Sequence, residues 1–357
     1  MRVGLSLLTL VPGAVGGSET YARELARALA ASRGLDVHAF VPPIAPDAGE
    51  GLPTTVVEEY RVAGSTARRG ALLALATLRP APLRRRLAGI DVVHYPLTVP
   101  VPRMPDARTV VTLHDLQHHD LPRNFGRALR AYRSLAYDRA ARRADAVIVI
   151  SEFVRRRAIE LLGLDPGRVH AVPLGVDRER FRPGEAAERE AALLLYPAHT
   201  WPHKNHTRLL EAFRLLRHER PELRLVLTGG GLDVLGPLPE GVERRDQVSL
   251  DQLAELYRRA SCLVFPSLYE GFGLPPLEAM ASGCPVAASE REAITEVCDD
   301  AAVLFDPEDP AAIAAGVSEA LARADELRRL GLDRSAAFTW ERTAELHGQV
   351  YRAVAPA

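Results

Sequence analysis

Two glutamates lie eight residues apart in a context that suggests ligand chemistry. Glu270 and Glu278 belong to the stretch SLYEGFGLPPLEAM. A helical glutamate facing a cleft can accept hydrogen bonds from both hydroxyls of a ribose, and a loop glutamate can hold a sugar hydroxyl or a developing positive charge. Gly271 and Gly273 allow the loop between them to turn its N–H groups toward a ligand. The alternative, two solvated glutamates beside a turn, does not explain the Gly-Phe-Gly-Leu-Pro context.

Lys204 is the only lysine among the 45 Lys and Arg residues of the chain. Because every other basic side chain is arginine, a lysine here suggests a place where the broad guanidinium does not fit. Lys204 lies in PAHTWPHKNH, between a predicted strand and a predicted helix. A phosphate at the start of that helix would suit a compact charge. The alternative is the chance survival of one surface lysine.

A histidine and a glycine pair hold comparable places in the first half of the chain. His114 follows an apolar run and is expected to bind a sugar hydroxyl or relay a proton. Asp115 would orient its imidazole or cap the next turn, and a purely structural histidine is the alternative. Gly16 and Gly17 open a helix whose free N–H groups favour an anion. The alternative there is a plain turn with Ser18 as the N-cap.

Metal and cofactor sites are not expected. His118 and His119 follow His114, but a zinc site would lack enough acidic or cysteine partners. The chain contains no Asp-x-Asp, so a metal clamp on a diphosphate has no evident ligands. Lys204, helix N-termini and loop N–H groups would then stabilise a departing phosphate.

Short apolar runs alternate with amphipathic segments along the whole chain. Continuous Val, Ile and Leu runs are typical of parallel strands covered on both faces, and their alternation with helices indicates doubly wound α/β sheets. The predicted strands are residues 3–10, 35–41, 91–94, 109–113, 146–150, 193–196, 223–227, 262–265, 285–287 and 302–304. The predicted helices are residues 18–31, 67–88, 124–142, 152–162, 205–219, 250–259, 275–282, 309–322 and 324–334, followed by one near 339–355. The Pro-rich residues 43–55 and 96–106 are expected to be loops.

A length of 357 residues favours two domains. The stretch LGVDRERFRPGE, residues 174–185, is rich in charge, Gly and Pro and is predicted to link a domain of residues 1–173 to one of residues 186–338. Ligands of such folds bind at the carboxyl ends of the strands. With two facing domains, that predicts a ligand in the central cleft.

Charge is unevenly distributed, although the net charge is only −1 and gives no drive toward nucleic acid. Residues 1–170 carry 24 arginines and 16 acids, whereas residues 171–357 carry 21 basic residues and 30 acids. Such arginine clusters are usually solvated helix faces, but they also attract an anionic membrane or a phosphorylated acceptor. The sequence therefore allows peripheral membrane contact through the basic half.

The three cysteines form no CxxC pair, which indicates a reducing, cytoplasmic compartment. An apolar run at residues 3–11 resembles a signal peptide, but a first strand entering a glycine loop explains the same residues. No apolar run reaches the ~18 residues of a spanning helix. A cytoplasmic location, extending to the inner membrane face, is expected.

The Glu270 region also carries a family resemblance. EGFGLPPLEA, followed by ASGCPVAAS, resembles the E-x7-E signature of the retaining glycosyltransferases of family 4. GGSETYARELARAL, VISEFVRRRAIE and VPLGVDRERFRP are similar to that family in its usual order, so the resemblance covers about residues 3–350. It implies a GT-B fold, with two Rossmann-like domains, the acceptor bound by the first and a nucleotide-sugar by the second. Residues 339–357 would cross back to the first domain as a helix.

The resemblance also implies a role for each candidate residue. Lys204 resembles the lysine that neutralises the donor diphosphate, and Glu278 the glutamate that binds the ribose. Glu270 resembles the glutamate beside the donor sugar, and His114 the first-domain histidine near the sugar and the departing phosphate. The remaining donor contacts implied are backbone contacts from Phe272, Gly273 and Leu274, and the approach of Gly16 and Gly17 to the diphosphate.

One position departs from the family pattern. Many members have an arginine a few residues before the lysine, where this chain has Ala198 and His199. In an arginine-rich chain, codon drift is a poor explanation for this absence. Either His199 or His203 contributes instead, or less charge acts on the diphosphate.

The expected activity is metal-independent transfer of a hexose with retention. The TWPHKNH loop looks like that of mannosyltransferases and related enzymes, which favours GDP-mannose as donor. A polyprenyl-linked glycan, a polysaccharide end or a small natural product would serve as acceptor. The rival hypotheses are a nucleotide-sugar epimerase, a phosphorylase with pyridoxal phosphate on Lys204, and a non-catalytic nucleotide-sugar-binding protein.

Overall fold

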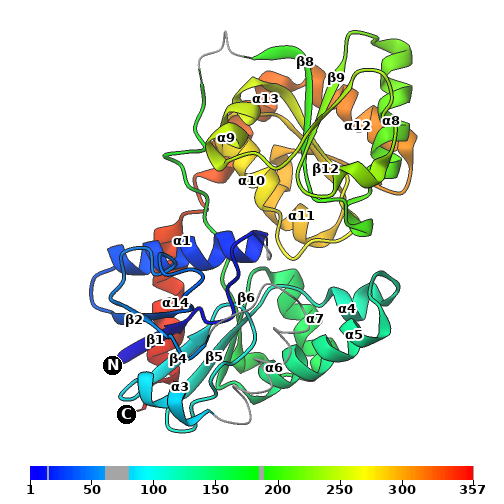
Figure 1. The fold of residues 1–357 in the computed structure, drawn as a ribbon. Coiled ribbons are helices and arrows are strands. Elements are labelled where there is room, and N and C mark those ends of the chain that lie inside the picture. Colours follow the sequence, from blue (N-terminus) through cyan, green and yellow to red (C-terminus); the bar gives the residue numbers. More distant parts are fainter. Residues whose placement is uncertain (14–15, 61–79, 185–188, 357) are drawn as a thin grey trace. The chain divides into compact units, whose positions relative to one another are not determined.

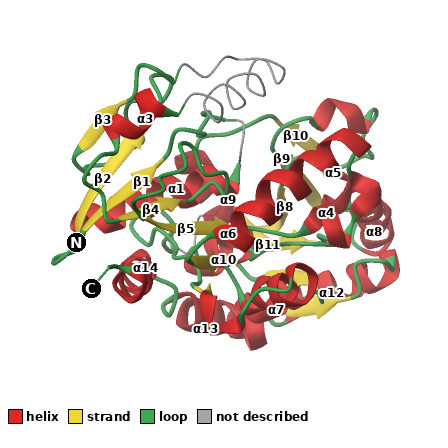
Figure 2. Cartoon of the chain, turned by 90° about the horizontal axis from the view of Figure 1, so that it is seen from below, coloured by secondary structure: helices red, strands yellow, loops and turns green. Residues whose placement is uncertain are grey.

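The chain forms two compact units. The computed structural model describes residues 1–13, 16–60, 80–184 and 189–356. The first unit comprises Met1–Gly175 and Trp340–Ala357, and the second comprises Val176–Thr339. Each unit has its own sheet with helices around it (Figure 1; Figure 2). The assignment of acceptor binding to one domain and donor binding to the other stays a prediction.

The first unit contains a seven-stranded parallel sheet with the order β3-β2-β1-β4-β5-β6-β7. Its strands are β1 Arg2–Ser6, β2 Asp36–Val41, β3 Thr54–Val56, β4 Val92–Tyr95, β5 Arg108–Leu113, β6 Ala146–Val149 and β7 Val169–Ala171. Every residue of β4 and β6 is buried, as expected for strands covered on both faces. The strand order reverses between β1 and β4, and ligands of open α/β sheets bind beside such a switch point.

The helices of the first unit follow the predicted order. They are α1 Gly17–Ala31, α3 Ala81–Arg86, α4 Gln117–Asp120, α5 Arg127–Arg133, α6 Arg139–Arg143, α7 Glu152–Leu162 and α14 Trp340–Val354. The single helix predicted over residues 124–142 is wrong in detail, because a π-helical turn, Ser134–Asp138, separates α5 from α6. Of the helix predicted over residues 67–88, residues 67–79 lie outside the described residues. The C-terminal helix α14 packs against α1.

The second unit repeats the architecture with six parallel strands in the order β10-β9-β8-β11-β12-β13. They are β8 Glu190–Pro197, β9 Arg224–Thr228, β10 Val242–Arg245, β11 Ala260–Phe265, β12 Val286–Ser289 and β13 Val303–Phe305. Here the order reverses between β8 and β11. The two doubly wound parallel sheets predicted from the alternating pattern are confirmed.

Amphipathic helices cover the second sheet. They are α8 His206–Glu219, α9 Leu250–Arg259, α10 Leu274–Ala281, α11 Glu292–Cys298, α12 Pro310–Ala322 and α13 Ala324–Ser335. Ser249 starts α9 with a capping box to Gln252, which fixes where that helix begins. Among the helices of the described residues, none combines the length and the apolar character that crossing a membrane requires.

Candidate active site

Lys204 and Glu270 form an ion pair at the switch point of the second sheet. Lys204 lies in the loop after β8, and Glu270 lies in the loop after β11. The Lys204 Nζ donates to Glu270 Oε1 at 2.5 Å, and the hydroxyl of Ser267 donates to the same oxygen at 2.5 Å. Only 13% of the lysine side chain and 15% of the glutamate side chain are exposed. The fold thus brings together two predicted site residues that are 66 positions apart.

Backbone anchors on both sides of Lys204 hold its loop in place. Asn205 adopts the left-handed conformation at φ 61°, which asparagine tolerates better than most residues. Its side-chain amide donates to the carbonyls of Pro266, at 3.0 Å, and Pro307, at 2.7 Å. The Tyr196 hydroxyl donates to the Lys204 carbonyl at 2.5 Å. The ammonium therefore extends from a rigid backbone at the start of α8.

This arrangement is suited to exchanging one anion for another. A phosphate can replace the Glu270 carboxylate as the partner of Lys204, because both form charge-assisted hydrogen bonds with an ammonium. The N-terminus of α8 adds its favourable potential for negative charge. Once Lys204 turns to a phosphate, Glu270 retains the Ser267 hydroxyl and can accept from a sugar hydroxyl.

Glu278 is buried in α10 and carries a perturbed carboxyl group. The Tyr257 hydroxyl donates to its Oε2 at 3.0 Å. Burial raises the pKa of Glu278 to about 7, and the Tyr257 hydrogen bond and the Arg180 charge partly oppose that rise. With Oε2 held by Tyr257, Oε1 is the oxygen available to a ligand hydroxyl.

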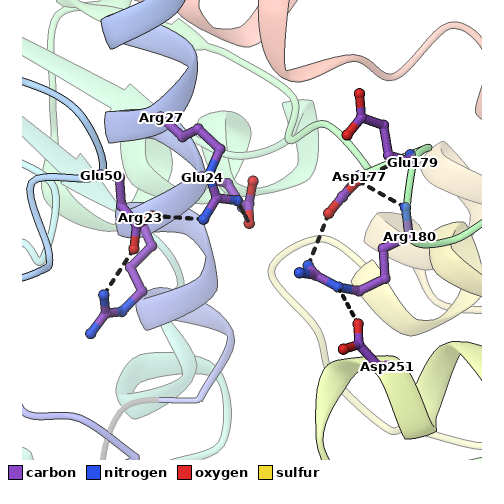
Figure 3. Close-up of polar contacts among 8 residues, drawn as sticks. All are labelled: Arg23, Glu24, Arg27, Glu50, Asp177, Glu179, Arg180 and Asp251. Atoms are coloured by element: carbon purple, nitrogen blue, oxygen red, sulfur yellow. Dashed lines mark hydrogen bonds and ion pairs between the residues drawn. The ribbon is translucent and has the colours of Figure 1, made fainter.

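Arg180 lies near Glu278 between two other carboxylates. Its Nη1 donates to Asp177 at 2.9 Å and its Nε donates to Asp251 at 3.0 Å (Figure 3). The adjacent Phe181 is buried and packs edge-on against Tyr257, with ring centroids 5.9 Å apart. Part of the segment predicted as a linker therefore packs around the Glu278 site within the second unit.

His199 lies in the lysine loop as an uncharged imidazole. Burial, and then the charge of Lys204, lower the pKa of His199 below its usual value, so the imidazole is neutral at pH 7. The ring stacks on Trp201 at a centroid distance of 5.0 Å. A Cβ on Gly230 would lie 2.5 Å from the His199 Nδ1, so this close packing requires glycine. The prediction did not identify this glycine run after β9, although three consecutive glycines, residues 229–231, are visible in the sequence.

Phe272, Gly273 and Leu274 lead the chain from the Glu270 loop into α10. Phe272 is buried and packs edge-on against Phe338 at 5.9 Å. Gly273 precedes the helix at φ 130°, a conformation that other residues rarely adopt. Pro275 and Pro276 have no N–H, and the Leu277 N–H donates to the Gly273 carbonyl, so the Leu274 N–H is the donor that the first turn of α10 offers to a ligand.

His114 follows β5, as predicted, and its tautomer is fixed. The His114 Nε2 lies 2.7 Å from the Pro96 carbonyl, which can only accept, so Nε2 carries the proton. Burial lowers the pKa of His114, so the ring is neutral and Nδ1 is an acceptor. His114 is therefore equipped to accept from a sugar hydroxyl. Asp115 caps the next turn through the Gln117 N–H at 3.0 Å, so of its two predicted roles the geometry supports capping.

The glycine loop before α1 is partly occupied by an acid of the chain itself. Gly16 precedes the helix at φ 51°, and no side-chain cap is present, so the alternative prediction of Ser18 as the N-cap is wrong. The Gly13 N–H donates to Glu19 at 2.8 Å. Arg23 holds Glu19 at 3.1 Å and Glu50 at 2.9 Å (Figure 3 draws Arg23 and Glu50). Gly16 and Gly17 thus lie at a helix N-terminus that already favours a carboxylate.

A buried chain of hydrogen bonds in the first unit has one consistent direction. The His347 Nδ1 donates to the Thr343 carbonyl, so its neutral Nε2 accepts from the Tyr21 hydroxyl at 2.8 Å. Tyr21 must then accept from Thr112, which in turn accepts from the Nε2 of His94, both at 2.8 Å. The neutral His94 finally accepts from Tyr351 through Nδ1. The ring of Tyr21 packs edge-on against His114, with the ring centroids 5.0 Å apart, which links these hydrogen bonds to the candidate site.

We expect this series of buried hydrogen bonds to make the first unit sensitive to acid. Burial lowers the pKa of His347 from 6.5 to about 4, so the unfolded state binds a proton between these values and the folded state does not. The contribution of His347 to stability is therefore fully present above pH 6.5 and is lost as the pH falls toward 4. From His347 alone, the unfolding free energy at pH 5 should be about 2 kcal/mol below that at pH 7.5.

Urea unfolding followed by Trp340 fluorescence, in a Trp201→Phe background, isolates the first unit because the chain has two tryptophans. His347→Gln should lose about 2 kcal/mol of the pH dependence. An unchanged pH dependence in His347→Gln would contradict the assignment.

His118 and His119 do have an acidic partner, contrary to the prediction. Asp138, which is buried in the π-helical turn, accepts from His118 at 3.0 Å and from His119 at 2.9 Å. The three groups could together contact a metal ion. However, a metal-bound histidine normally donates its other N–H to a second acceptor. The buried His118 Nδ1 has no partner among the described residues, so this set fits a hydrogen-bonded triad better than a metal centre.

Comparison with known proteins adds two family matches. A family model described as "Glycosyl transferases group 1" matches residues 177–332, and one described as "Glycosyltransferase Family 4" matches residues 15–180. A D-inositol 3-phosphate glycosyltransferase of Geodermatophilus obscurus is 33% identical over 250 residues, which are 62% of this chain and 56% of that protein. The O-antigen chain mannosyltransferase B of Escherichia coli is 31% identical over 258 residues, 66% of this chain and 67% of that protein. The chain thus spans little more than half the length of the first relative.

Solved structures resemble the chain over nearly its whole length. Sucrose-phosphate synthase from Thermosynechococcus elongatus matches with a TM-score of 0.77 and 24% identity, covering 99% of each chain. HepE of Anabaena, in complex with UDP and glucose, matches with a TM-score of 0.70 and 14% identity, covering 99% of this chain and 100% of that one. At these identities the matches show the fold alone, and they confirm the predicted GT-B class.

Proposed function

Because the chain belongs to glycosyltransferase family 4, we propose that it is a retaining glycosyltransferase that moves a hexose from a nucleotide-sugar to a hydroxyl acceptor. The observation that carries the proposal is the shielded Lys204–Glu270 ion pair beside the switch point of the second sheet. Glu278, with one oxygen held by Tyr257, adds a buried acceptor for a ribose. The HepE complex contains UDP, and an equivalent nucleotide site in this chain is part of the proposal.

The proposed reaction breaks the bond between the anomeric carbon and the diphosphate oxygen of the donor. The acceptor hydroxyl oxygen forms the new bond on the same face, and its proton moves to the departing phosphate oxygen, so the anomeric configuration is retained. Lys204 and the N-terminus of α8 stabilise the negative charge that develops on the diphosphate. Glu270 stabilises the positive charge on the sugar, and His114 accepts from a sugar hydroxyl through Nδ1. A covalent intermediate on Glu270 is the less favoured alternative.

For the donor we propose GDP-mannose, and for the acceptor a glycan end, a polyprenyl-linked glycan or a small natural product. The support for mannose is the TWPHKNH loop together with the E. coli relative, which is named a mannosyltransferase. The Geodermatophilus relative is named for a different reaction, so the donor has to be tested directly.

We expect GDP and GDP-mannose to raise the melting temperature of the second unit more than the uridine, thymidine or adenosine counterparts do. Binding to the folded state alone stabilises it by about 2.7 kcal/mol at 100 times Kd. The measurement is a thermal-shift panel of nucleoside diphosphates and nucleotide-sugars at equal concentration. The matched control is Lys204→Ala, which should lose most of each shift.

The outcomes separate the parts of the proposal. A larger shift with a uridine or adenosine donor would replace GDP-mannose and leave the transferase assignment intact. No shift with any nucleoside diphosphate would contradict the donor site itself. Incubation of the donor without acceptor tests the epimerase hypothesis, since only an epimerase converts the donor to a new nucleotide-sugar under that condition.

A further inference from the structure

Helix α5 buries none of its own residues, yet it carries large apolar side chains. Leu129 is 51% exposed, Tyr132 is 40% exposed, and Leu135, just beyond the helix end, is 65% exposed. The other large apolar side chains that are exposed in the described residues are scattered singly along the sequence. Single exposed apolar residues are ordinary, whereas three in succession along one helical segment indicate an interaction surface.

These three side chains follow each other at intervals of three residues along one continuous helical segment. Leu129 and Tyr132 lie on α5, where at 3.6 residues per turn their directions differ by about 60°, and Leu135 follows in the π-helical turn. We call Leu129, Tyr132 and Leu135 the apolar stripe. The chain continues through the π-helical turn into α6, which packs against β5, and α5 lies on the outer side of this unit (Figure 1). The apolar stripe therefore belongs to the part of the helical segment that the unit does not cover.

Unneutralised arginines border the apolar stripe. Most arginines elsewhere in this unit form ion pairs, such as Arg23 with Glu19 and Arg157 with Asp120. In contrast, six exposed arginines on or near the helical segment form neither an ion pair nor a side-chain hydrogen bond with any described residue, whereas the exposed Arg142 donates to the Leu162 carbonyl. They are Arg103, Arg123, Arg127, Arg130, Arg139 and Arg143.

Three of these charges lie close enough to repel each other. The charge of Arg139, and to a smaller extent the charge of Arg103, lowers the pKa of Arg143. The only acid between residues 121 and 144 is Asp138, which is buried between His118 and His119. Because no local carboxylate relieves the repulsion, an external anion is the partner that would.

We propose that the apolar stripe and its bordering arginines dock this protein on an anionic lipid surface. A helix that shows Leu and Tyr on one side and arginines around them inserts its apolar side chains at the level of the headgroups, and its arginines meet the lipid phosphates. An acidic protein would pair with the arginines but would need a hollow for three projecting apolar side chains. Docking requires no sugar donor, so the inference is independent of the proposed transfer reaction.

The test is co-sedimentation at low and high salt with two kinds of vesicle. One is made of phosphatidylcholine alone, and the other also contains about 30 mol% phosphatidylglycerol. We expect binding to the phosphatidylglycerol vesicles at least tenfold stronger than to phosphatidylcholine, and largely lost in about 0.5 M NaCl. Leu129→Ser/Tyr132→Ser/Leu135→Ser and Arg139→Ser/Arg143→Ser should each weaken it about tenfold. All five residues are exposed, so the melting temperature should be unchanged.

Matched controls come from the second unit. Leu215→Ser and Val234→Ser remove exposed apolar side chains, and Arg323→Ser removes a paired arginine, so these variants should bind as wild type does. Equal binding by the stripe variants and wild type would overturn the proposal, as would retention of wild type in high salt or its failure to bind. A wild-type dimer that the triple substitution converts to a monomer would also overturn it, because the apolar stripe would then join two copies of this chain.

Discussion

Replacing Lys204 with alanine is expected to lower kcat/KM for the nucleotide-sugar by about 10³-fold. The substitution removes the charge that would face the departing diphosphate, where the neutral His199 offers no replacement. Loss of one preorganised donor to a developing oxyanion reduces turnover by roughly 10²–10³-fold, and a full charge in a shielded site belongs at the upper end of that range. Steady-state kinetics on the purified enzyme measure the effect.

Lys204→Arg should recover less than a tenth of the lost activity, although it restores the charge. The ammonium lies 2.5 Å from Glu270 and 5.6 Å over the Phe265 ring, in a place where only 13% of the side chain is exposed. A planar guanidinium is wider than an ammonium and would have to displace one of these neighbours. Wild-type turnover in Lys204→Arg would show that steric fit does not explain the single lysine of the chain.

A comparison of ligands separates a diphosphate role from a structural one. Lys204→Ala leaves Glu270 without its partner, so part of the loss could come from a displaced glutamate. If Lys204 binds the diphosphate, the variant should lose affinity for a nucleoside diphosphate and keep its affinity for the nucleoside. Equal losses for both ligands would indicate a collapsed loop. Glu270→Gln, which also breaks the ion pair, is the matched control.

The sheets were predictable because their strands are buried on both faces. Continuous apolar runs such as residues 146–150 indicate a central parallel strand, and the structure has β6 there. The edge strands β3, Thr54–Val56, and β10, Val242–Arg245, were missed because half-exposed strands carry polar residues and no continuous apolar run. The π-helical turn at Ser134–Asp138 was missed because its sequence has the same apolar spacing as a straight helix.

The candidate residues could be found from the sequence, but not the groups that hold them. Lys204 and Glu270 stand in conspicuous loops, and the fold brings them together as partners. Tyr257, which donates a hydrogen bond to Glu278, lies in an ordinary amphipathic helix, where the sequence pattern predicts only a core residue. Asp138 was overlooked as a partner of His118 because it lies 20 residues away. Such partners depend on tertiary contacts, which periodicity and spacing do not encode.

Substituting Gln for Glu278 should have opposite effects on stability and activity. The folded protein holds the pKa of Glu278 at about 7, above the usual 4.5, so the charged form is disfavoured in the folded state. The resulting penalty appears as the pH rises from 4.5 to 7 and is complete above 7. At pH 8, Glu278→Gln should therefore raise the unfolding free energy by about 3 kcal/mol, with little change at pH 4.5. Urea unfolding at the two pH values measures the difference.

The same substitution should reduce kcat/KM by about 10²-fold, because the amide oxygen would accept from Tyr257 and the amide NH2 group, which cannot accept from a ribose hydroxyl, would replace Oε1. Wild-type kcat/KM should rise with pH through about 7 as Glu278 ionises, and the Gln variant should lack this rise. Tyr257→Phe removes the hydrogen bond that lowers this pKa. Its kcat/KM should therefore rise at a higher pH and reach a plateau as the wild type does. A Gln variant that is more stable and fully active would show that the buried carboxylate does not bind the donor. A variant that is less active but no more stable would show that its charge is not disfavoured by burial.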